Sequence, residues 1–198
     1  EVRSHIKRDF YAVGEYWTAD ADTLRTYLSD VDHQLNLFDV TLHFNFHDAS
    51  LQNNEYDLTQ IFAGTLVESN PWNTVTFVDN HDSQYGQSLQ SWVEDWFKPL
   101  AYALILLRRD GYPCLFYGDY YGTGGPDALA GHRDILDVLL HARRELAYGE
   151  QIDTFDHPNV VAWQRLGDPE HPGSGLAVLL SNGDNGEKVL DFGLERAG

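Results

Sequence analysis

The stretch VTFVDNHDSQYG, residues 75–86, begins as a buried strand and ends in a cluster of polar side chains. Its first four residues are β-branched or aromatic, as is typical of the inside of a sheet. Residues 79–82, Asp-Asn-His-Asp, follow at once, although charged groups are costly to bury unless they are paired or solvated. We therefore expect this strand to end at a loop-built site on a rigid scaffold.

The same alternation of strand and helix extends to both sides of this stretch. The predicted strands cover residues 10–17, 35–44, 74–79 and 113–118, and the predicted helices cover residues 21–31, 55–66, 96–111 and 132–149. Strands that alternate with helices in this way favour a parallel sheet or a βα barrel. A doubly wound sheet is the alternative, but no Gly-rich phosphate loop follows any of the strands.

The pattern changes after Gly149. Short strands are predicted at residues 151–158, 159–166, 175–183 and 187–194, separated by turn signals such as Asn182-Gly183 and Asn185-Gly186. We therefore expect two domains, residues 1–149 with βα units and residues 150–198 with an all-β segment.

Composition excludes some classes of partner. The chain has 198 residues and a net charge of −18, from 13 basic and 31 acidic residues. Nucleic acids and anionic membranes require basic patches, so neither is expected as a partner. The sequence shows no signal peptide and no apolar run of transmembrane length, and it leaves an extracellular and a cytoplasmic location equally open. Aromatic residues make up 13%, which suits a cleft that stacks on flat ligands.

Carboxylates collect at the predicted ends of the strands, where a βα barrel carries its active site. Glu15 ends the first strand, Asp79 and Asp82 end the third, and Asp119 follows the fourth. A pair of carboxylates beside aromatic rings suits glycoside hydrolysis, in which one protonates the leaving oxygen and another stabilises the cationic sugar. The structural alternatives are a solvated residue for Glu15, a helix cap or turn for Asp82, and core packing for Trp17.

Two other chemistries, a zinc site and a serine hydrolase, are alternatives that the sequence disfavours. His43 and His47 have a spacing that would suit zinc, but no third ligand stands at a diagnostic distance in the sequence. A Ser-His-Asp hydrolase is disfavoured because the sequence contains no Gly-x-Ser-x-Gly turn.

Three segments carry a resemblance to a known family. VGEYW (residues 13–17), FVDNHD (77–82) and GYPCLFYGDYYG (111–122) resemble, in this order, the later signature segments of glycoside hydrolase family 13. The similarity is to α-amylases of the bacterial liquefying type and their fungal relatives, and it runs through most of the chain. It implies strands five to eight of a (β/α)8 TIM barrel, followed by part of a C-terminal antiparallel β domain.

The resemblance also implies roles for individual residues. Glu15 is similar to the general acid/base of the family, and Asp82 to the carboxylate that stabilises the transition state through sugar hydroxyls. His81, Trp17 and Tyr16 match positions that contact the sugar. The implied activity is endo-hydrolysis of α-1,4-glucosidic bonds in starch-type glucans, with retention of configuration.

One departure from the family is important. The family nucleophile is an Asp at the end of strand four, and no segment like it occurs in this sequence. The resemblance therefore implies a partner, an N-terminal half of the barrel with strands one to four, without which this chain would be inactive. The alternatives are a non-catalytic glucan-binding module derived from an amylase and a transglycosylase on the same scaffold.

Calcium is implied for the complete protein, mostly through ligands upstream of this chain. Related bacterial enzymes also have a peripheral calcium beside the C-terminal sheet, and its counterparts here are Asn54, Tyr56, Asn159 and Asn182. Asn159 and Asn182 stand where acidic ligands are expected. Neutral amides bind calcium more weakly than carboxylates, so these residues are weak candidates.

Overall fold

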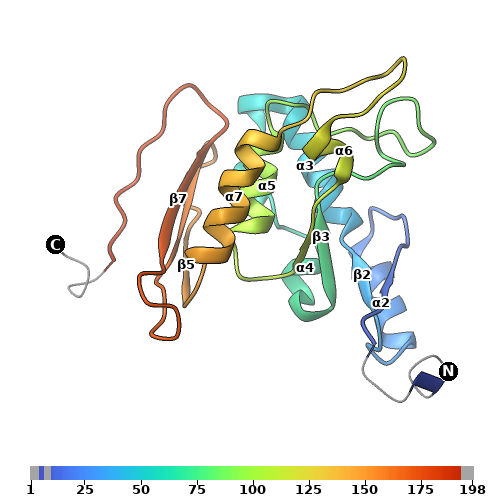
Figure 1. Cartoon of the computed structure of the whole chain (residues 1–198), viewed down its shortest axis with the longest axis horizontal. Coiled ribbons are helices and arrows are strands. Elements are labelled where there is room, and N and C mark those ends of the chain that lie inside the picture. Colours follow the sequence, from blue (N-terminus) through green and yellow to red (C-terminus); the bar gives the residue numbers. More distant parts are fainter. Residues whose placement is uncertain (1–4, 7–9, 193–198) are drawn as a thin grey trace.

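The computed structural model describes residues 5–6 and 10–192. Four parallel strands with their helices form one part, and a three-stranded antiparallel sheet forms the other (Figure 1). Helix α7 (Arg133–Glu145) lies between the two parts in this view. The arrangement is that of a partial α/β barrel followed by an antiparallel sheet, as the sequence predicted.

The parallel sheet has the order β1-β2-β3-β4. Its strands are β1 (Val13–Gly14), β2 (Asn36–Phe38), β3 (Thr74–Phe77) and β4 (Tyr112–Cys114). Every neighbouring pair is parallel, so the C-terminal ends of all four strands lie along the same end of the sheet. Among the described residues, β1 and β4 each pair on one side only, so this sheet has two open edges.

Helices and single helical turns connect the strands. They are α2 (Ala21–Asp30), α3 (Val40–Gln52), η1 (Asn53–Glu55), η2 (Leu58–Gln60), α4 (Leu66–Ser69), η3 (Pro71–Asn73), α5 (Lys98–Leu106), α6 (Tyr117–Tyr121) and α7. Helix α2 begins where the Asp20 carboxylate accepts a hydrogen bond from the Asp22 backbone N–H at 3.0 Å. This satisfies one of the free donors of its first turn. Pro99 lies in the first turn of α5, as predicted.

Three sequence predictions of secondary structure were wrong. The strand predicted at residues 35–44 ends at Phe38, because the Asp39 carboxylate accepts from Leu42 N–H at 3.0 Å and begins α3 there. The helix predicted at residues 55–66 is instead the turn η2 followed by the start of α4. No strand forms over residues 187–192, and the remainder of the strand predicted there lies outside the described residues.

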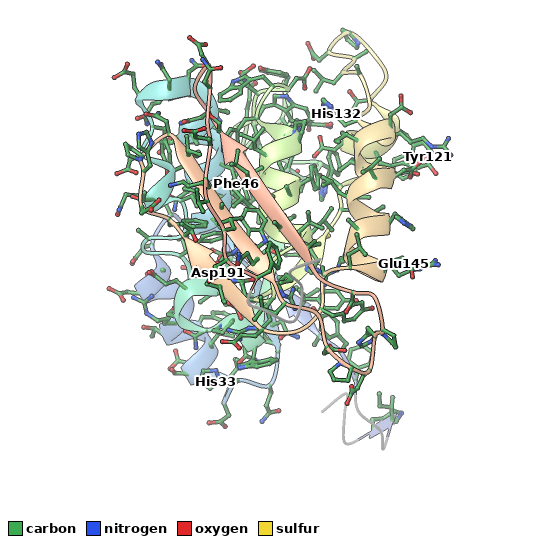
Figure 2. The ribbon with its side chains drawn as sticks, turned by 90° about the vertical axis from the view of Figure 1, so that its left-hand side faces the viewer. His33, Phe46, Tyr121, His132, Glu145 and Asp191 are labelled. Carbon is green, nitrogen blue, oxygen red and sulfur yellow. The ribbon has the colours of Figure 1, made fainter. Side chains whose placement is uncertain are left out.

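The antiparallel sheet has the order β5-β6-β7, with β5 (Gln151–Thr154), β6 (Val160–Arg165) and β7 (Leu176–Ser181). Figure 2 looks onto this sheet, with α7 beside it. All six residues of β6 are buried. Trp163 of β6 is fully buried and belongs to the same core as Phe46 of α3 and the apolar face of α5. The domain boundary near residue 150 stays a prediction, since one core runs across it.

Within the described part of the chain, no helix combines the length and apolarity needed to cross a bilayer.

Candidate active site

Carboxylates follow all four parallel strands, and they fall into two classes. Asp39, Asp79 and Asp119 are buried, with at most 2% of each residue exposed. Glu15 is exposed and Asp82 is partly exposed. Only the second class has oxygens that a substrate could reach, so burial separates the carboxylates held inside the fold from those that are accessible at the strand ends.

Asp39 stabilises two helix starts. Its carboxylate accepts from the backbone N–H groups of Leu42, Leu66 and Val67, at 3.0, 3.2 and 2.8 Å, and from the Thr41 hydroxyl at 2.6 Å. Burial raises the pKa of Asp39, and the hydrogen bonds to Thr41 and the backbone oppose that rise. The sequence pattern did not indicate this role for Asp39, because the residue lies inside the strand predicted at residues 35–44.

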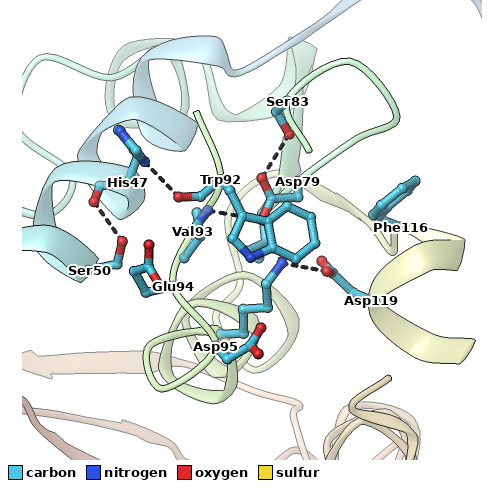
Figure 3. A network of polar contacts seen from close by, with 12 residues as sticks. His47, Ser50, Asp79, Ser83, Trp92, Val93, Glu94, Asp95, Phe116 and Asp119 are labelled. Carbon is cyan, nitrogen blue, oxygen red and sulfur yellow. Dashed lines mark hydrogen bonds and ion pairs between the residues drawn. The ribbon is translucent and has the colours of Figure 1, made fainter. Parts of the chain in front are cut away.

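Asp79 belongs to a buried ionic network that sequence analysis did not predict (Figure 3). Lys98, the first residue of α5, has no exposed surface and donates to Asp79 Oδ2 at 2.6 Å. Lys98 also donates to Asp119, which accepts a further hydrogen bond from the Tyr102 hydroxyl. One ammonium thus joins a carboxylate that follows β3 to one that follows β4.

The surroundings of this network are largely apolar. The Trp92 ring covers Lys98, with the ammonium nitrogen 3.2 Å from the ring centroid. Burial raises the pKa of Asp79, while the adjacent Lys98 ammonium lowers it. Burial and the Asp119 carboxylate hold the pKa of Tyr102 well above its usual range. Tyr102 therefore remains a neutral hydrogen-bond donor.

The network also holds the loop that presents Asp82. The Ser83 hydroxyl donates to Asp79 Oδ1 at 2.7 Å. Asn80 Oδ1 accepts from the backbone N–H groups of Asp82 and Ser83, both at 2.9 Å. Asp82 keeps 36% of its side chain exposed, and its Oδ2 lies 3.5 Å from Nε2 of His81, whose side chain is 74% exposed. Buried contacts thus fix a turn from which Asp82 and His81 remain accessible.

Glu15 stands directly after β1 and is exposed. Among the described residues its carboxylate makes no hydrogen bond or ion pair, in contrast to those of Asp39, Asp79 and Asp119. Strand β2 separates β1 from β3, and neighbouring strands lie about 4.8 Å apart, so the backbones that carry Glu15 and Asp82 are on the order of 10 Å apart. Both residues lie at the end of the sheet where the parallel strands finish.

The two aromatic residues after Glu15 lie against other rings. Trp17 is partly buried, and its ring centroid lies 5.3 Å from that of His43, 5.9 Å from that of Phe44 and 6.2 Å from that of Phe77. Tyr16 is 44% exposed and lies against Tyr27 of α2 at 5.8 Å. Trp17 therefore has a packing role on one side, and sugar contact by either residue stays a prediction.

The two histidines whose spacing would suit zinc have other partners. His43 is buried, its Nδ1 donates to Val78 O at 2.6 Å, and its Nε2 lies 2.8 Å from Ser91 Oγ. Burial lowers the pKa of His43 to about 4, so the ring is neutral at pH 7. His47 Nδ1 bonds to Trp92 O at 2.7 Å. Among the described residues, no group of three or more His, Cys, Asp or Glu side chains could hold a metal ion.

The peripheral calcium candidates form a network of amides at the seam between η1 and the antiparallel sheet. Asn159 Nδ2 donates to Asn54 O at 2.6 Å and to Asn182 Oδ1 at 3.0 Å. Asn182 Nδ2 donates to the backbone oxygens of Asn53 and Tyr56, both at 2.8 Å. The amide orientations are consistent, because reversing Asn182 would place its oxygen against two carbonyl oxygens.

This chemistry does not fit calcium. The cation prefers carboxylate and carbonyl oxygens. Here the carbonyl oxygens already accept hydrogen bonds from amide N–H groups, and no carboxylate takes part in the network. The amides of Asn159 and Asn182 thus join the segment around η1 to the antiparallel sheet through hydrogen bonds.

The change Asn182→Asp is expected to make stability depend on calcium. Without calcium, the new carboxylate would face the carbonyl oxygens of Asn53 and Tyr56 and would leave them without a donor, at about 1–3 kcal/mol for each unsatisfied group. With calcium, the new carboxylate and the carbonyl oxygens of Asn53 and Tyr56 become ligands. Thermal melting in EDTA and in calcium measures the difference.

The matched control is Asn185→Asp, which adds the same charge at an exposed position beyond β7. Its melting temperature should respond to calcium no more than that of the unchanged protein. Equal calcium responses of the two variants would contradict the account of the seam.

Comparison with known proteins finds similar sequences over nearly the whole of this chain. It is 47% identical over 199 residues to a glucan 1,4-alpha-maltohexaosidase of Bacillus sp. (strain 707), which covers 100% of this chain and 38% of the relative. It is 45% identical over 199 residues to an alpha-amylase of Bacillus licheniformis, covering 100% of this chain and 39% of the relative. A cytoplasmic alpha-amylase of Escherichia coli (strain K12) is 47% identical over 201 residues, covering 97% and 40%.

Solved structures agree on the fold. A cyclomaltodextrin glucanotransferase, CldA, superimposes with a TM-score of 0.63 at 20% identity, over 91% of this chain and 40% of that one. No family model matches the sequence. The chain spans about two fifths of the length of the curated relatives it matches.

Proposed function

The chain belongs to the α-amylase family, glycoside hydrolase family 13, and we propose that it supplies the general acid/base to an enzyme that hydrolyses α-1,4-glucans. The observation that carries this proposal is the contrast between buried and accessible carboxylates at the C-terminal ends of the parallel strands. Three strand-end carboxylates are buried and hydrogen-bonded, whereas Glu15 and Asp82 are accessible. A general acid must reach the glycosidic oxygen directly.

In the proposed mechanism, Glu15 donates its proton to the glycosidic oxygen as that bond breaks. An Asp nucleophile outside this chain forms the bond to the anomeric carbon, giving a covalent glycosyl-enzyme. Glu15, now a carboxylate, takes a proton from the water that hydrolyses this intermediate and is protonated again. Two displacements at one carbon retain its configuration.

Asp82 is proposed to accept hydrogen bonds from sugar hydroxyls beside the cleaved bond, where they strengthen as positive charge develops on the ring. His81 extends from the same turn and is proposed to contact the same sugar. Tyr16 and Trp17 follow Glu15 in sequence and are proposed to border the neighbouring glucose, whose apolar face suits aromatic rings.

The open edges of the sheet support the need for a second half. Strands β1 and β4 lack an outer neighbour among the described residues. Large apolar side chains are exposed on both, with Val13 of β1 at 43% and Tyr112 of β4 at 63%. Open strand edges and exposed apolar groups favour pairing with another segment. We propose that an N-terminal half with strands one to four pairs with both edges and brings the nucleophile.

The test is to produce the chain with and without an N-terminal half, taken from its own gene or from a relative. Alone, the chain is expected to associate with itself and to release no reducing sugar from starch above background, because both edges are open and the nucleophile is absent. The added half is expected to restore hydrolysis. Reducing-sugar release and size-exclusion chromatography measure the two effects.

The control for this test is an N-terminal half whose nucleophilic Asp is replaced by Asn. This half should prevent the chain from associating with itself but should not restore starch hydrolysis. A monomeric chain that hydrolyses starch unaided would contradict both the half-barrel assignment and the external nucleophile.

A further inference from the structure

The positive charge of this acidic protein is concentrated in one place. The chain has 13 lysines and arginines against 31 acidic residues. Five arginines nevertheless line a single cavity of about 480 Å³, together with Leu140, Ala147 and Tyr148: Arg108, Arg109, Arg143, Arg144 and Arg165. The cavity lies between the C-terminal ends of α5 and α7 and the end of β6, near Glu145 in Figure 2.

Three of these arginines have carboxylate partners. The pairs are Arg108 with Asp153 at 2.7 Å, Arg109 with Asp110 at 3.1 Å, and Arg144 with Glu145 at 2.6 Å. Each of these positive charges is therefore balanced nearby, and these pairs leave the cavity walls close to neutral.

The other two arginines bond only to backbone oxygens. Arg143 donates to Leu106 O at 2.6 Å, and Arg165 donates to Gly149 O at 3.2 Å from Nε and 3.0 Å from Nη2. Among the described residues, no carboxylate lies within 4.0 Å of either guanidinium. Arg165 is only 6% exposed. A buried charge without a counter-ion is costly, so Arg165 favours an anion, and the partly buried Arg143 lines the same cavity.

The electrostatics are consistent with this geometry. Burial lowers the pKa of Arg165, Arg109 and Arg143 lower it further, and Asp110 opposes them. Burial also lowers the pKa of Arg143. An arginine does not lose its proton at physiological pH, so relief must come from a ligand and not from titration.

The partial negative charge at the C-terminal ends of α5 and α7 could replace a bound anion only in part. Leu106 O belongs to the last turn of α5, and helix C-termini carry about half a negative charge. That partial charge lies on the Arg143 side of the cavity. Arg165, at the end of β6, donates to one carbonyl oxygen only, and Asp110 offsets its charge in part without forming an ion pair with it.

We propose that this cavity is a binding site for a phosphate-type oxyanion, either free or as the phosphoryl group of a small ester. Guanidinium groups bind phosphate through paired N–H donors in a planar fork. Arg143 and Arg165 approach from α7 and β6, so an anion between them would join the barrel helices to the antiparallel sheet. This site lies at the helix C-termini, away from the strand ends that carry Glu15 and Asp82.

The experiment uses the longest product of the gene, with its N-terminal half supplied where solubility requires it. Inorganic phosphate, glucose 1-phosphate and glucose are titrated separately by calorimetry at constant ionic strength. Saturable binding of either phosphate compound, with a rise in melting temperature, is expected, and glucose alone should not compete. Binding of the ester alone would identify a phosphoryl ester as the ligand.

Variants identify the site. Arg143→Gln and Arg165→Gln are each expected to weaken phosphate binding about tenfold or more, because each removes charge-assisted hydrogen bonds. Arg143→Lys keeps the charge but loses the fork, so it should bind with intermediate affinity, and it serves as the test if the glutamine variants do not fold. Arg133→Gln, at the opposite end of α7 with 63% of its side chain exposed, is the matched control and should bind normally.

Two results would overturn the proposal. The first is an effect of phosphate that rises linearly without saturation, as is expected from general salt stabilisation. The second is saturable binding that is equally strong in the Arg143 and Arg165 variants, which would place the anion elsewhere. Starch hydrolysis is measured in parallel, so a failure of anion binding is distinguishable from a failure of the proposed activity.

Discussion

Replacing Glu15 by Gln is expected to lower the turnover of starch by about 10²–10⁴-fold in the protein completed with its N-terminal half. An amide has the size of the carboxyl group but cannot donate a proton to the leaving oxygen. An aryl glycoside with a good leaving group should lose less rate in its first step, because its oxygen needs little protonation. Initial rates on both substrates measure the difference.

Stability separates this effect from misfolding. The Glu15 carboxylate is exposed and has no hydrogen bond or ion pair among the described residues, so Glu15→Gln should change the unfolding free energy by no more than about 0.5 kcal/mol. Glu170→Gln, which removes the same charge from an exposed residue between β6 and β7, is the matched control and should retain full activity. Near-normal starch hydrolysis by Glu15→Gln would remove this residue from the acid/base role.

The sequence was a good guide to the order of the elements. Apolar strands that alternate with amphipathic helices predicted the parallel sheet, and Glu15 and Asp82 follow β1 and β3 as expected, although both strands end before the predicted residues 17 and 79. The prediction failed where one side chain begins a helix inside an apolar run that is typical of a strand. The run around residues 35–44 looks like one strand, but Asp39 caps a helix in its middle. A cap depends on which N–H group a carboxylate meets, and spacing alone does not show that.

The candidate site divides in the same way. Carboxylates at strand ends were visible in the sequence, but their division into buried and accessible classes was not. Asp79 and Asp119 are 40 residues apart in sequence, and Lys98 between them belongs to an otherwise apolar helix start. Only the folded chain brings all three groups together, so the sequence pattern alone does not show that Lys98 is buried.

The buried network leads to the second large prediction. Lys98→Met is expected to lower the unfolding free energy by about 3–5 kcal/mol, because it leaves Asp79 and Asp119 buried without their shared cation. The methionine fills similar volume, so the loss measures uncompensated charge more than a cavity. Urea denaturation, followed by Trp fluorescence, gives the free energy for the completed protein.

A second variant distinguishes charge from packing. When Asp79 and Asp119 are also replaced by Asn, the core no longer holds unpaired charges, and part of the stability lost in Lys98→Met should return. Lys188→Met, which breaks an ion pair at Asp156, is the control and should cost about 1 kcal/mol or less. A loss from Lys98→Met as small as that control would show that the network contributes little.

The same variants connect the network to the proposed chemistry. Ser83 bonds to Asp79, and Asn80 Oδ1 holds the backbone N–H groups of Asp82 and Ser83, so the buried ion pair fixes the turn that presents Asp82. If the triple variant regains stability but not starch hydrolysis, the network positions Asp82 in addition to stabilising the core. Equal recovery of both would mean that the turn keeps its geometry without the charges, and that Asn80 and the local backbone are sufficient to orient Asp82.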